Sequence, residues 1–375
     1  MPQSEGKTAL VLAGGGIMGA AYEIGCLTAL ERLFAPGFST GRFDMFVGVS
    51  AGAVIAALLA NRIPPSQLFE AIAREERSVF NFRRSDIYRI DLWEVLGCCG
   101  RLAINLPRIL WHFHSNRLRL SGSDLFHVLQ EQFPAGLFSL GPMQNYLCHS
   151  FRTEGIRDAF HLIDPELYIP AYDLDRGERV VFGSEGFRDV HICQAITASS
   201  AIPFFFRPHK VGEHYYLDGS TGRVTHLDVA LEQGAKLIVV FNPRVPMAND
   251  MERACLPSLS LGKCSSIADL GITFAWEQAR RIENKEKLDL ALAGYRREHP
   301  EVDILLIEPP QEESLLFFQS PMSHTARHHV MNHGYHLTLG HLRDLYGEFR
   351  QVFARHGIPT TDAHLDAAPP AEVAT

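Results

Sequence analysis

The sequence has no apolar run close to the roughly 18 residues that a membrane-spanning helix needs. Near its N-terminus it has one lysine, Lys7, and only a short apolar run over 9–13. That run is too brief for the hydrophobic part of a secretory signal, and we interpret it as a first strand. We therefore expect neither a membrane span nor an N-terminal signal peptide.

Cysteine is sparse, with seven in 375 residues, an odd number that includes no Cys-x-x-Cys pair. This usage argues against a disulfide framework and against a thiolate zinc site, and it favours a reducing compartment. The adjacent Cys98 and Cys99 fit buried thiols better than a redox centre. The expected location is cytoplasmic, with the option of peripheral membrane contact.

Positive charge is also in deficit, because 35 Lys and Arg face 43 Asp and Glu, for a net charge of −8. No broad basic field is available to attract nucleic acid, so we expect no nucleic-acid partner. The hydrophobic share of 46% is that of a globular chain, long enough for one large domain or two ordinary ones.

Short apolar runs alternate with helical periodicity along most of the chain. Alternation of this kind predicts an α/β sandwich around a mainly parallel sheet. The expected strands are 8–13, 43–49, 167–171, 179–182, 215–217, 236–241 and 302–307. The expected helices are 20–33, 52–60, 192–199, 227–233, 265–297 and 324–354, and 66–130 is mostly helical in pattern.

Gly14, Gly16 and Gly19 fit G-x-G-x-x-G between the first strand and the first helix. One interpretation is a dinucleotide-binding turn, as in an oxidoreductase, which requires an acid at the end of the second strand. The acid of that strand, Asp44, lies at its beginning, and the strand leads instead to Ser50. The sequence therefore disfavours this interpretation.

The residues Gly48-Val49-Ser50-Ala51-Gly52 fit G-x-S-x-G between a strand and a helix, the pattern of a nucleophile elbow. The alternative is a structural Gly-Ser-Gly turn. Both glycine motifs follow strands, and the carboxyl ends of parallel strands meet at one edge of a sheet. The N–H groups of Gly15 and Gly16 could then stabilise an oxyanion formed at Ser50, at roughly 3–4 kcal/mol per donor.

A serine nucleophile needs a base, and the chain has 18 histidines, so a Ser-His-Asp triad has to be considered. An elbow this near the N-terminus fits the α/β-hydrolase order poorly. The other candidate is Asp218, which follows a short strand and precedes Gly219. Its alternative role is a turn cap.

Taken together and in their order along the chain, these motifs resemble those of the patatin-like phospholipase family over roughly residues 8–232. The residues that carry the resemblance are Gly14-Gly15-Gly16-x-x-Gly19, the elbow 48–52, Ala198-Ser199-Ser200-Ala201-Ile202-Pro203 and Asp218-Gly219. The stretch from 295–297 to 321–322 loosely resembles C-terminal extensions of bacterial members.

The resemblance implies a three-layer α/β/α sandwich and a lipid acyl hydrolase with a Ser–Asp dyad, with no metal and no cofactor. Ser50 would be the nucleophile, Asp218 the base, and Gly14, Gly15 and Gly16 the oxyanion hole. The motif glycines would be Gly19, Gly48, Gly52 and Gly219. The partner would be a lipid or another acyl ester. A catalytically impaired lipid-binding protein is the alternative.

Two positions depart from the family pattern. Many members have Arg or Lys where Met18 stands, so a cation that could assist the oxyanion or a phosphate headgroup is missing there. Ser220 replaces a Gly or Ala after Asp218-Gly219, and its hydroxyl could bond to Asp218 and change its basicity.

The resemblance divides the chain into a catalytic domain over 8–232, with a lid-like helical insertion at about 66–130, and a C-terminal α/β extension over 233–358. The tail 359–375 is expected to be disordered.

Residues 83–119 contain seven arginines and three acids within an acidic chain, together with Trp93 and Trp111. This composition predicts either an interfacial element that meets anionic lipid or an ordinary packed helix with solvated arginines.

Five histidines lie close together near the C-terminus, at His324, His328, His329, His333 and His336. Their i, i+4 spacing would place pairs on one helix face, but no Cys or Glu-x-x-His motif completes a metal site. We expect no metal to bind there.

Overall fold

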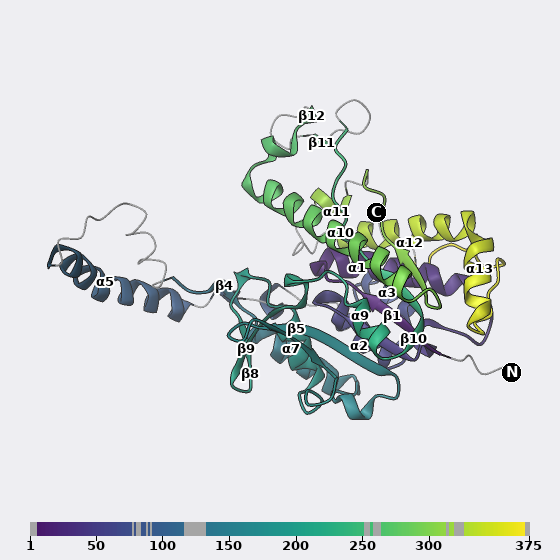
Figure 1. Ribbon diagram of the computed structural model, residues 1–375, viewed down its shortest axis with the longest axis horizontal. Coiled ribbons are helices and arrows are strands. Elements are labelled where there is room, and N and C mark those ends of the chain that lie inside the picture. The colour runs from purple at the N-terminus through teal and green to yellow at the C-terminus, as the bar shows by residue number, and fades with distance from the viewer. Residues whose placement is uncertain are drawn as a thin grey trace.

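The structure is a computed structural model that describes residues 6–76, 79, 84–87, 89–90, 92–115, 133–250, 256–257, 264–312, 315–318 and 326–371. Its centre is an eight-stranded sheet in the order β13-β10-β1-β2-β5-β9-β8, with β6 paired to β5. The strands from β13 to β5 are parallel, and β6, β8 and β9 join antiparallel. The predicted α/β fold with a mainly parallel sheet is confirmed (Figure 1).

The strands of this sheet are β1 (Lys7–Leu12), β2 (Met45–Gly48), β5 (Glu166–Asp173), β6 (Glu178–Phe182), β8 (His209–Val211), β9 (His214–Asp218), β10 (Ala235–Phe241) and β13 (Asp303–Ile307). Side chains alternate between the two faces of a strand, and both faces of β1 are buried. Buried parallel strands read as continuous apolar runs for this reason.

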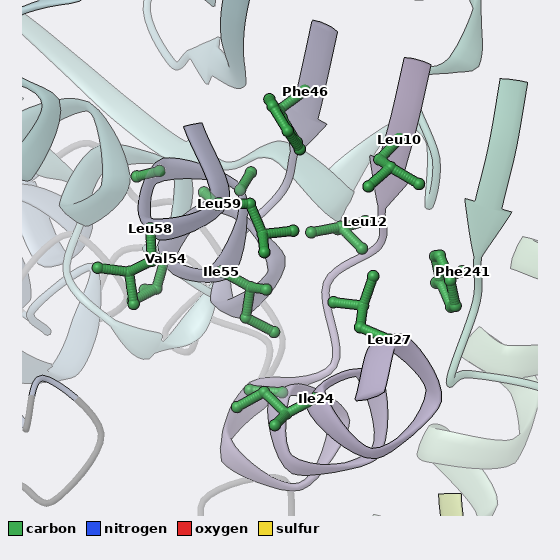
Figure 2. Packing of buried hydrophobic residues seen from close by; sticks show 14 of the residues in the cluster. Leu10, Leu12, Ile24, Leu27, Phe46, Val54, Ile55, Leu58, Leu59 and Phe241 are labelled. Carbon is green, nitrogen blue, oxygen red and sulfur yellow. The ribbon is translucent and has the colours of Figure 1, made fainter. Parts of the chain in front are cut away.

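Helices cover both faces of the sheet. Leu10 and Leu12 pack on one side with α1 (Gly16–Leu33) and α2 (Ala51–Ala60), and Figure 2 shows their contact layer with Ile24, Leu27, Ile55 and Leu59. The same cluster includes residues of α3 (Pro65–Ala73), α7 (Gly141–Thr153), α8 (Ile192–Ser199) and α12 (Arg327–Asp344). Ala9 and Val11 face the other side, toward α9 (Leu227–Glu232) and α10 (Ile272–Glu298). Three layers result.

The N-terminal α1 and the C-terminal α12 cross in very close contact. A Cβ atom added at Gly25 would lie 2.1 Å from the Met331 carbonyl oxygen, and one at Gly334 would lie 2.6 Å from that of Tyr22. Only glycine allows the two backbones to approach this closely. The C-terminal helices therefore belong to the same core as the glycine loop.

The remaining elements decorate this core. They are η1 (Thr40–Arg42), α4 (Arg84–Ile87), β3 (Arg89–Ile90), α5 (Leu92–Ser115), β4 (Gly136–Ser139), η2 (Phe160–Leu162), β7 (Phe204–Phe206), η3 (Gly219–Thr221), β11 (Leu256–Pro257), β12 (Cys264–Ser265), η4 (Ile267–Leu270), α11 (Leu315–Phe318) and α13 (Tyr346–Arg355). A small sheet has the order β3-β4-β7. From it α5 extends away from the body, at the left of Figure 1. Among the described segments, none has both the length and the apolar character of a membrane-crossing helix.

Three expectations differ from the structure. The helix predicted over 324–354 is two helices, because the chain turns at Leu345 so that Phe349 and Phe353 reach the core. The tail is expected to be disordered from residue 359, but its first part packs on the core. Ala35 N donates a hydrogen bond to Pro359 O, Thr361 N donates one to Leu33 O, and Leu365 is buried. The argument against disulfides also fails at one pair, because Cys148 and Cys193 are bonded.

Candidate active site

Ser50 lies at the turn between β2 and α2, where the sequence predicted an elbow. Its backbone has φ 54° and ψ −122°, a conformation that is costly for a residue other than glycine. The flanking glycines have steric reasons. A Cβ at Gly48 would lie 2.6 Å from Ala53 Cα, and one at Gly52 would lie 2.6 Å from the Leu12 carbonyl oxygen.

The glycine loop between β1 and α1 lies against this turn. A Cβ at Gly14 would lie 3.0 Å from Ser50 Cβ, so the loop backbone and the serine side chain are neighbours. Gly16 adopts φ 63° at the start of α1. Within the described part of the chain, the amides of Gly14 and Gly15 donate no hydrogen bond, which leaves them available for a substrate oxygen.

Asp218 ends β9 and is buried at 1% exposure. Its Oδ1 accepts a 2.7 Å hydrogen bond from Ser220 N, whereas its Oδ2 has no partner at hydrogen-bonding distance among the described residues. The Ser50 hydroxyl nevertheless lowers the pKa of Asp218 by hydrogen bonding, so the two side chains are neighbours although they do not form a hydrogen bond of normal length. Long contacts of this kind are common in catalytic sites without substrate.

Burial is the largest influence on Asp218 and raises the pKa of its carboxyl above the ordinary value. The side chain and the N–H of Ser220, the Ser50 hydroxyl and the Arg244 charge each pull the pKa back down. A desolvated carboxylate is a stronger base than an exposed one, which suits proton abstraction from a hydroxyl.

The segment after α8 connects the two catalytic candidates. Ser199 Oγ accepts a hydrogen bond from Ser50 N (3.0 Å) and donates one to Pro170 O (2.7 Å) on β5. Two residues later, Ala201 O accepts a hydrogen bond from Asp218 N (2.9 Å). Ser199 and Ala201 therefore hold the serine turn and the aspartate strand in register, a role that their motif had not revealed.

A histidine base is not found beside Ser50 in the described residues. His209 bonds to Gln144, and His214 lies 3.0 Å from Asp173. His226 is buried, bonds to the Gly219 carbonyl, and has its pKa lowered to about 4, chiefly by burial. It therefore supports the loop after Asp218 as a neutral ring.

Arg244 supplies a cation that the sequence analysis missed. It follows β10, the neighbour of β1, and lines a small cavity together with Gly15, Met18 and Gly19. Its Nη2 bonds to both oxygens of Glu277 (2.9 and 3.0 Å), and Arg281 Nε bonds to the same carboxylate (2.9 Å). Two arginines and one glutamate leave a net positive charge behind the glycine loop. The adjacency of β1 and β10, which sequence does not reveal, is what places it there.

Ser50 opens into an apolar pocket with about 750 Å³ of empty space, part of it open to solvent. The walls come from α1, α2, α3, α7 and the segment 200–206, with Ala20, Val54, Ile72, Leu147, Ile202 and Phe206 among the lining residues. Arg327, 4% exposed, adds a charged group to the wall and lies 3.9 Å from Glu75. Such a lining suits a hydrocarbon chain.

Replacing Ser220 with alanine is expected to move the acid limb of the kcat/KM–pH profile to higher pH. The change removes a hydrogen bond that favours the carboxylate, so the pKa of Asp218 rises further and ionisation needs a higher pH. The measurement is initial rates on a soluble ester across pH. Ser184→Ala is the control, because the Ser184 hydroxyl bonds to Val181 O on another turn. An unmoved limb in Ser220→Ala would argue that another group titrates.

Two other expectations can be placed. Asp44 accepts hydrogen bonds from Thr8 N and Oγ1 (both 2.8 Å) at the start of β2. A dinucleotide site would need an acid at the other end of this strand, beside the glycine loop. Of the histidine cluster, His324 lies outside the described residues, and His328 is 3.5 Å from Glu75. The potential metal-ligating group found in the described chain contains none of these histidines.

Comparison with known protein families identifies the family of this chain. The sequence matches the model for "Patatin-like phospholipase" over residues 10–231, more than half of the chain. The chain belongs to the patatin-like phospholipase family. The match ends before β10, so the last two parallel strands of the sheet lie outside it.

Individual similar proteins share little sequence identity with this chain. "Probable lipid hydrolase 463L" of Invertebrate iridescent virus 6 is 22% identical over 224 residues, which are 60% of this chain and 63% of the viral protein. VipD from Legionella pneumophila is a structural neighbour with TM-score 0.38 and 16% identity, covering 90% of this chain and 67% of VipD. ExoU of Pseudomonas aeruginosa, solved in complex with SpcU, has TM-score 0.35 and 17% identity, covering 91% of this chain and 53% of that structure's chain.

Proposed function

We propose that this patatin-like protein is a lipid acyl hydrolase of the phospholipase A or esterase type, acting through a Ser50–Asp218 dyad. The observation that carries the proposal is the strained Ser50, which opens into an apolar pocket with the buried Asp218 beside it. Family membership and the name of the viral relative support lipid as the substrate class.

The proposed reaction has two steps. Asp218 takes the proton of the Ser50 hydroxyl as Oγ attacks the ester carbonyl, and the proton then passes to the departing alcohol or lysolipid. The acyl chain occupies the apolar pocket. Water, deprotonated by Asp218, then attacks the acyl-enzyme, and the proton passes from Asp218 to Ser50 Oγ as the ester bond breaks and the fatty acid leaves.

The oxyanion of each tetrahedral intermediate would be held by the backbone N–H groups of Gly14, Gly15 and Gly16. The positive charge of the Arg244–Glu277–Arg281 cluster behind this loop would favour the same anion. It would replace, from another strand, the cation that is missing at Met18.

The direct test combines two readouts on the purified chain. We expect fatty acid to be released from phospholipid vesicles, and a fluorophosphonate probe to label Ser50, identified by mass spectrometry of the labelled peptide. Vesicle binding without acyl release or labelling would instead favour the lipid-binding alternative.

We further propose that α5 and the adjacent small sheet meet the lipid surface, with the protein cytoplasmic and peripheral to the membrane. On α5, Trp111 is 72% and Ile104 60% exposed. On the small sheet, Leu137 and Phe204 are 64% and 79% exposed, and Gly136 pairs with Phe204. Phe204 lies in the chain between Ile202 and Phe206, which line the pocket, so the exposed apolar surface adjoins the site.

Glutamine at Arg101, Arg108, Arg117 and Arg119 is expected to weaken hydrolysis on anionic vesicles and to spare a short soluble ester. Arg101 and Arg108 are exposed on α5, whereas Arg117 and Arg119 lie outside the described residues. At about 1 kcal/mol for each arginine near an anionic surface, the loss could reach roughly 1000-fold at low salt, and salt should reduce it.

The matched control carries the same charge change at exposed arginines elsewhere: Arg74, Arg152, Arg297 and Arg350. Both variants are assayed on anionic vesicles, on neutral vesicles and on the soluble ester. Equal losses in the two variants would show a general charge effect, and a loss on the soluble ester would assign the α5 region to the site or the fold.

A further inference from the structure

The Cys148–Cys193 disulfide connects α7 to the first turn of α8, and the Asp158 carboxylate lies beside it with His191 as its neighbour. Asp158 Oδ2 lies 3.2 Å from Cys193 Sγ and 3.3 Å from His191 Nδ1. One ligand atom from each of Cys148, Asp158 and Cys193 can be chosen so that all lie within 4.8 Å of one another. Two sulfurs and one carboxylate therefore lie close together, and the His191 imidazole lies against that carboxylate.

Most of this arrangement does not depend on the disulfide. Asp158 O accepts a hydrogen bond from Ile192 N (3.2 Å), and Ala159 pairs with His191 in a short β-bridge. Asp158 Oδ1 accepts a 2.8 Å hydrogen bond from Cys193 N, which leaves Oδ2 toward the sulfur and the imidazole. Backbone contacts thus hold Asp158, His191 and Cys193 together whether or not the sulfurs are bonded.

We propose that the reduced chain binds one zinc ion here, through Cys148, Cys193, Asp158 and His191. Zinc takes four sulfur, nitrogen or oxygen ligands in a tetrahedron, with bonds of about 2.0–2.3 Å, so its ligand atoms are about 3.3–3.8 Å apart. The contacts around Asp158 Oδ2 already have nearly that spacing. The hydrogen bond to Asp158 Oδ1 is the kind of outer contact that orients a ligating carboxylate.

The disulfide-bonded state and the zinc-bound state interconvert by reduction and oxidation of the two cysteines. A dithiol reductant gives two electrons and two protons to the Cys148–Cys193 bond and becomes a disulfide itself, leaving two thiols. Zinc then binds both sulfurs as thiolates and displaces the two protons to solvent. Oxidation of the dithiolate reverses the sequence and releases the metal.

The position of the site ties it to the pocket. Cys148 lies one residue after Leu147, which lines the pocket, and Cys193 is on the helix that ends with Ser199, the partner of Ser50 N. Both the disulfide and a bound zinc ion would connect these two elements, so a chain with either should keep its pocket wall in place. Zinc binding itself does not depend on the proposed hydrolase activity.

The test uses the full chain, reduced under anaerobic conditions and freed of metal. Cobalt(II) serves as the spectroscopic probe, and zinc is measured by competition and by stoichiometry. We expect one metal ion per chain, a thiolate-to-cobalt charge-transfer band, and visible bands of tetrahedral cobalt. Cys148→Ser, Asp158→Asn and His191→Ala should each weaken zinc binding by at least about 10- to 100-fold, since even outer contacts of metal ligands have effects of that size. Cys98→Ser is the control and should bind normally.

A second measurement requires no variant. Titration of the zinc-loaded wild-type chain with a disulfide oxidant should release one zinc ion for each Cys148–Cys193 bond formed, as located by peptide mapping. Absence of zinc binding in the reduced chain, cobalt bands without thiolate character, or unchanged binding in the Asp158 or His191 variant would overturn the proposed ligand set.

Discussion

Replacing Ser50 with alanine is expected to lower kcat for ester hydrolysis by roughly a million-fold, the scale seen when a serine nucleophile is removed. Without Oγ no acyl-enzyme can form, and the remaining activity would come from the oxyanion hole and substrate binding alone. Alanine keeps the Cβ atom at the turn, so the midpoint of thermal unfolding should change little. The measurements are single-turnover and steady-state rates on a soluble ester.

Fluorophosphonate labelling should disappear in the same variant and persist in Ser184→Ala. Substantial hydrolysis by a folded Ser50→Ala protein would remove Ser50 from the mechanism and the dyad with it. Circular dichroism would show whether the Ser50→Ala protein is folded and unfolds cooperatively. If it does not, Ser50→Gly takes its place, because glycine adopts the positive φ of this turn readily.

Replacing Asp218 with asparagine is expected to lower kcat by roughly 10,000-fold with little loss of stability. The amide oxygen can still accept the hydrogen bond from Ser220 N, so the loop geometry is retained. It cannot take the Ser50 proton. Burial disfavours the charged carboxylate at this position, so a neutral amide should be tolerated in the fold.

Histidine variants distinguish a dyad from a triad. Alanine at His209 or His214 should change kcat only a few-fold, because these rings bond to Gln144 and Asp173. His226→Gln is preferred to His226→Ala, since the Gly219 carbonyl needs its partner. A folded histidine variant with a loss as large as that of Asp218→Asn would establish a histidine base.

Local chemistry explains why much of this site could be predicted. A β-rich run, a glycine and a small-residue helix around Ser50 leave few alternatives to a tight strand-to-helix turn, and that turn has φ 54°. The helix expected over 192–199 has those bounds, because its apolar spacing and the proline at 203 both act within a few residues. Features fixed by neighbours in sequence are visible in sequence.

Features that depend on the order of the strands in the sheet cannot be seen in the sequence. Arg244 reaches the glycine loop only because β10 pairs with β1, and Cys148 meets Cys193 only because α7 packs against α8. The tail from 359 has a composition typical of disorder, yet Leu365 is buried in a core cluster that also contains residues of α1 near the N-terminus. No local pattern reports such contacts.

The place of β1 in the sheet has a consequence for how the chain is made. Its partner β2 follows within about 40 residues, but its other partner, β10, is synthesised about 230 residues later. At about 5–20 residues per second on the ribosome, one edge of β1 stays without its partner for roughly 10–45 s. Unpaired strand edges template aggregation, so the nascent protein should depend on chaperones until β10 emerges. A gene fragment that stops at residue 231, where the family match ends, would leave that edge open permanently and should yield insoluble protein.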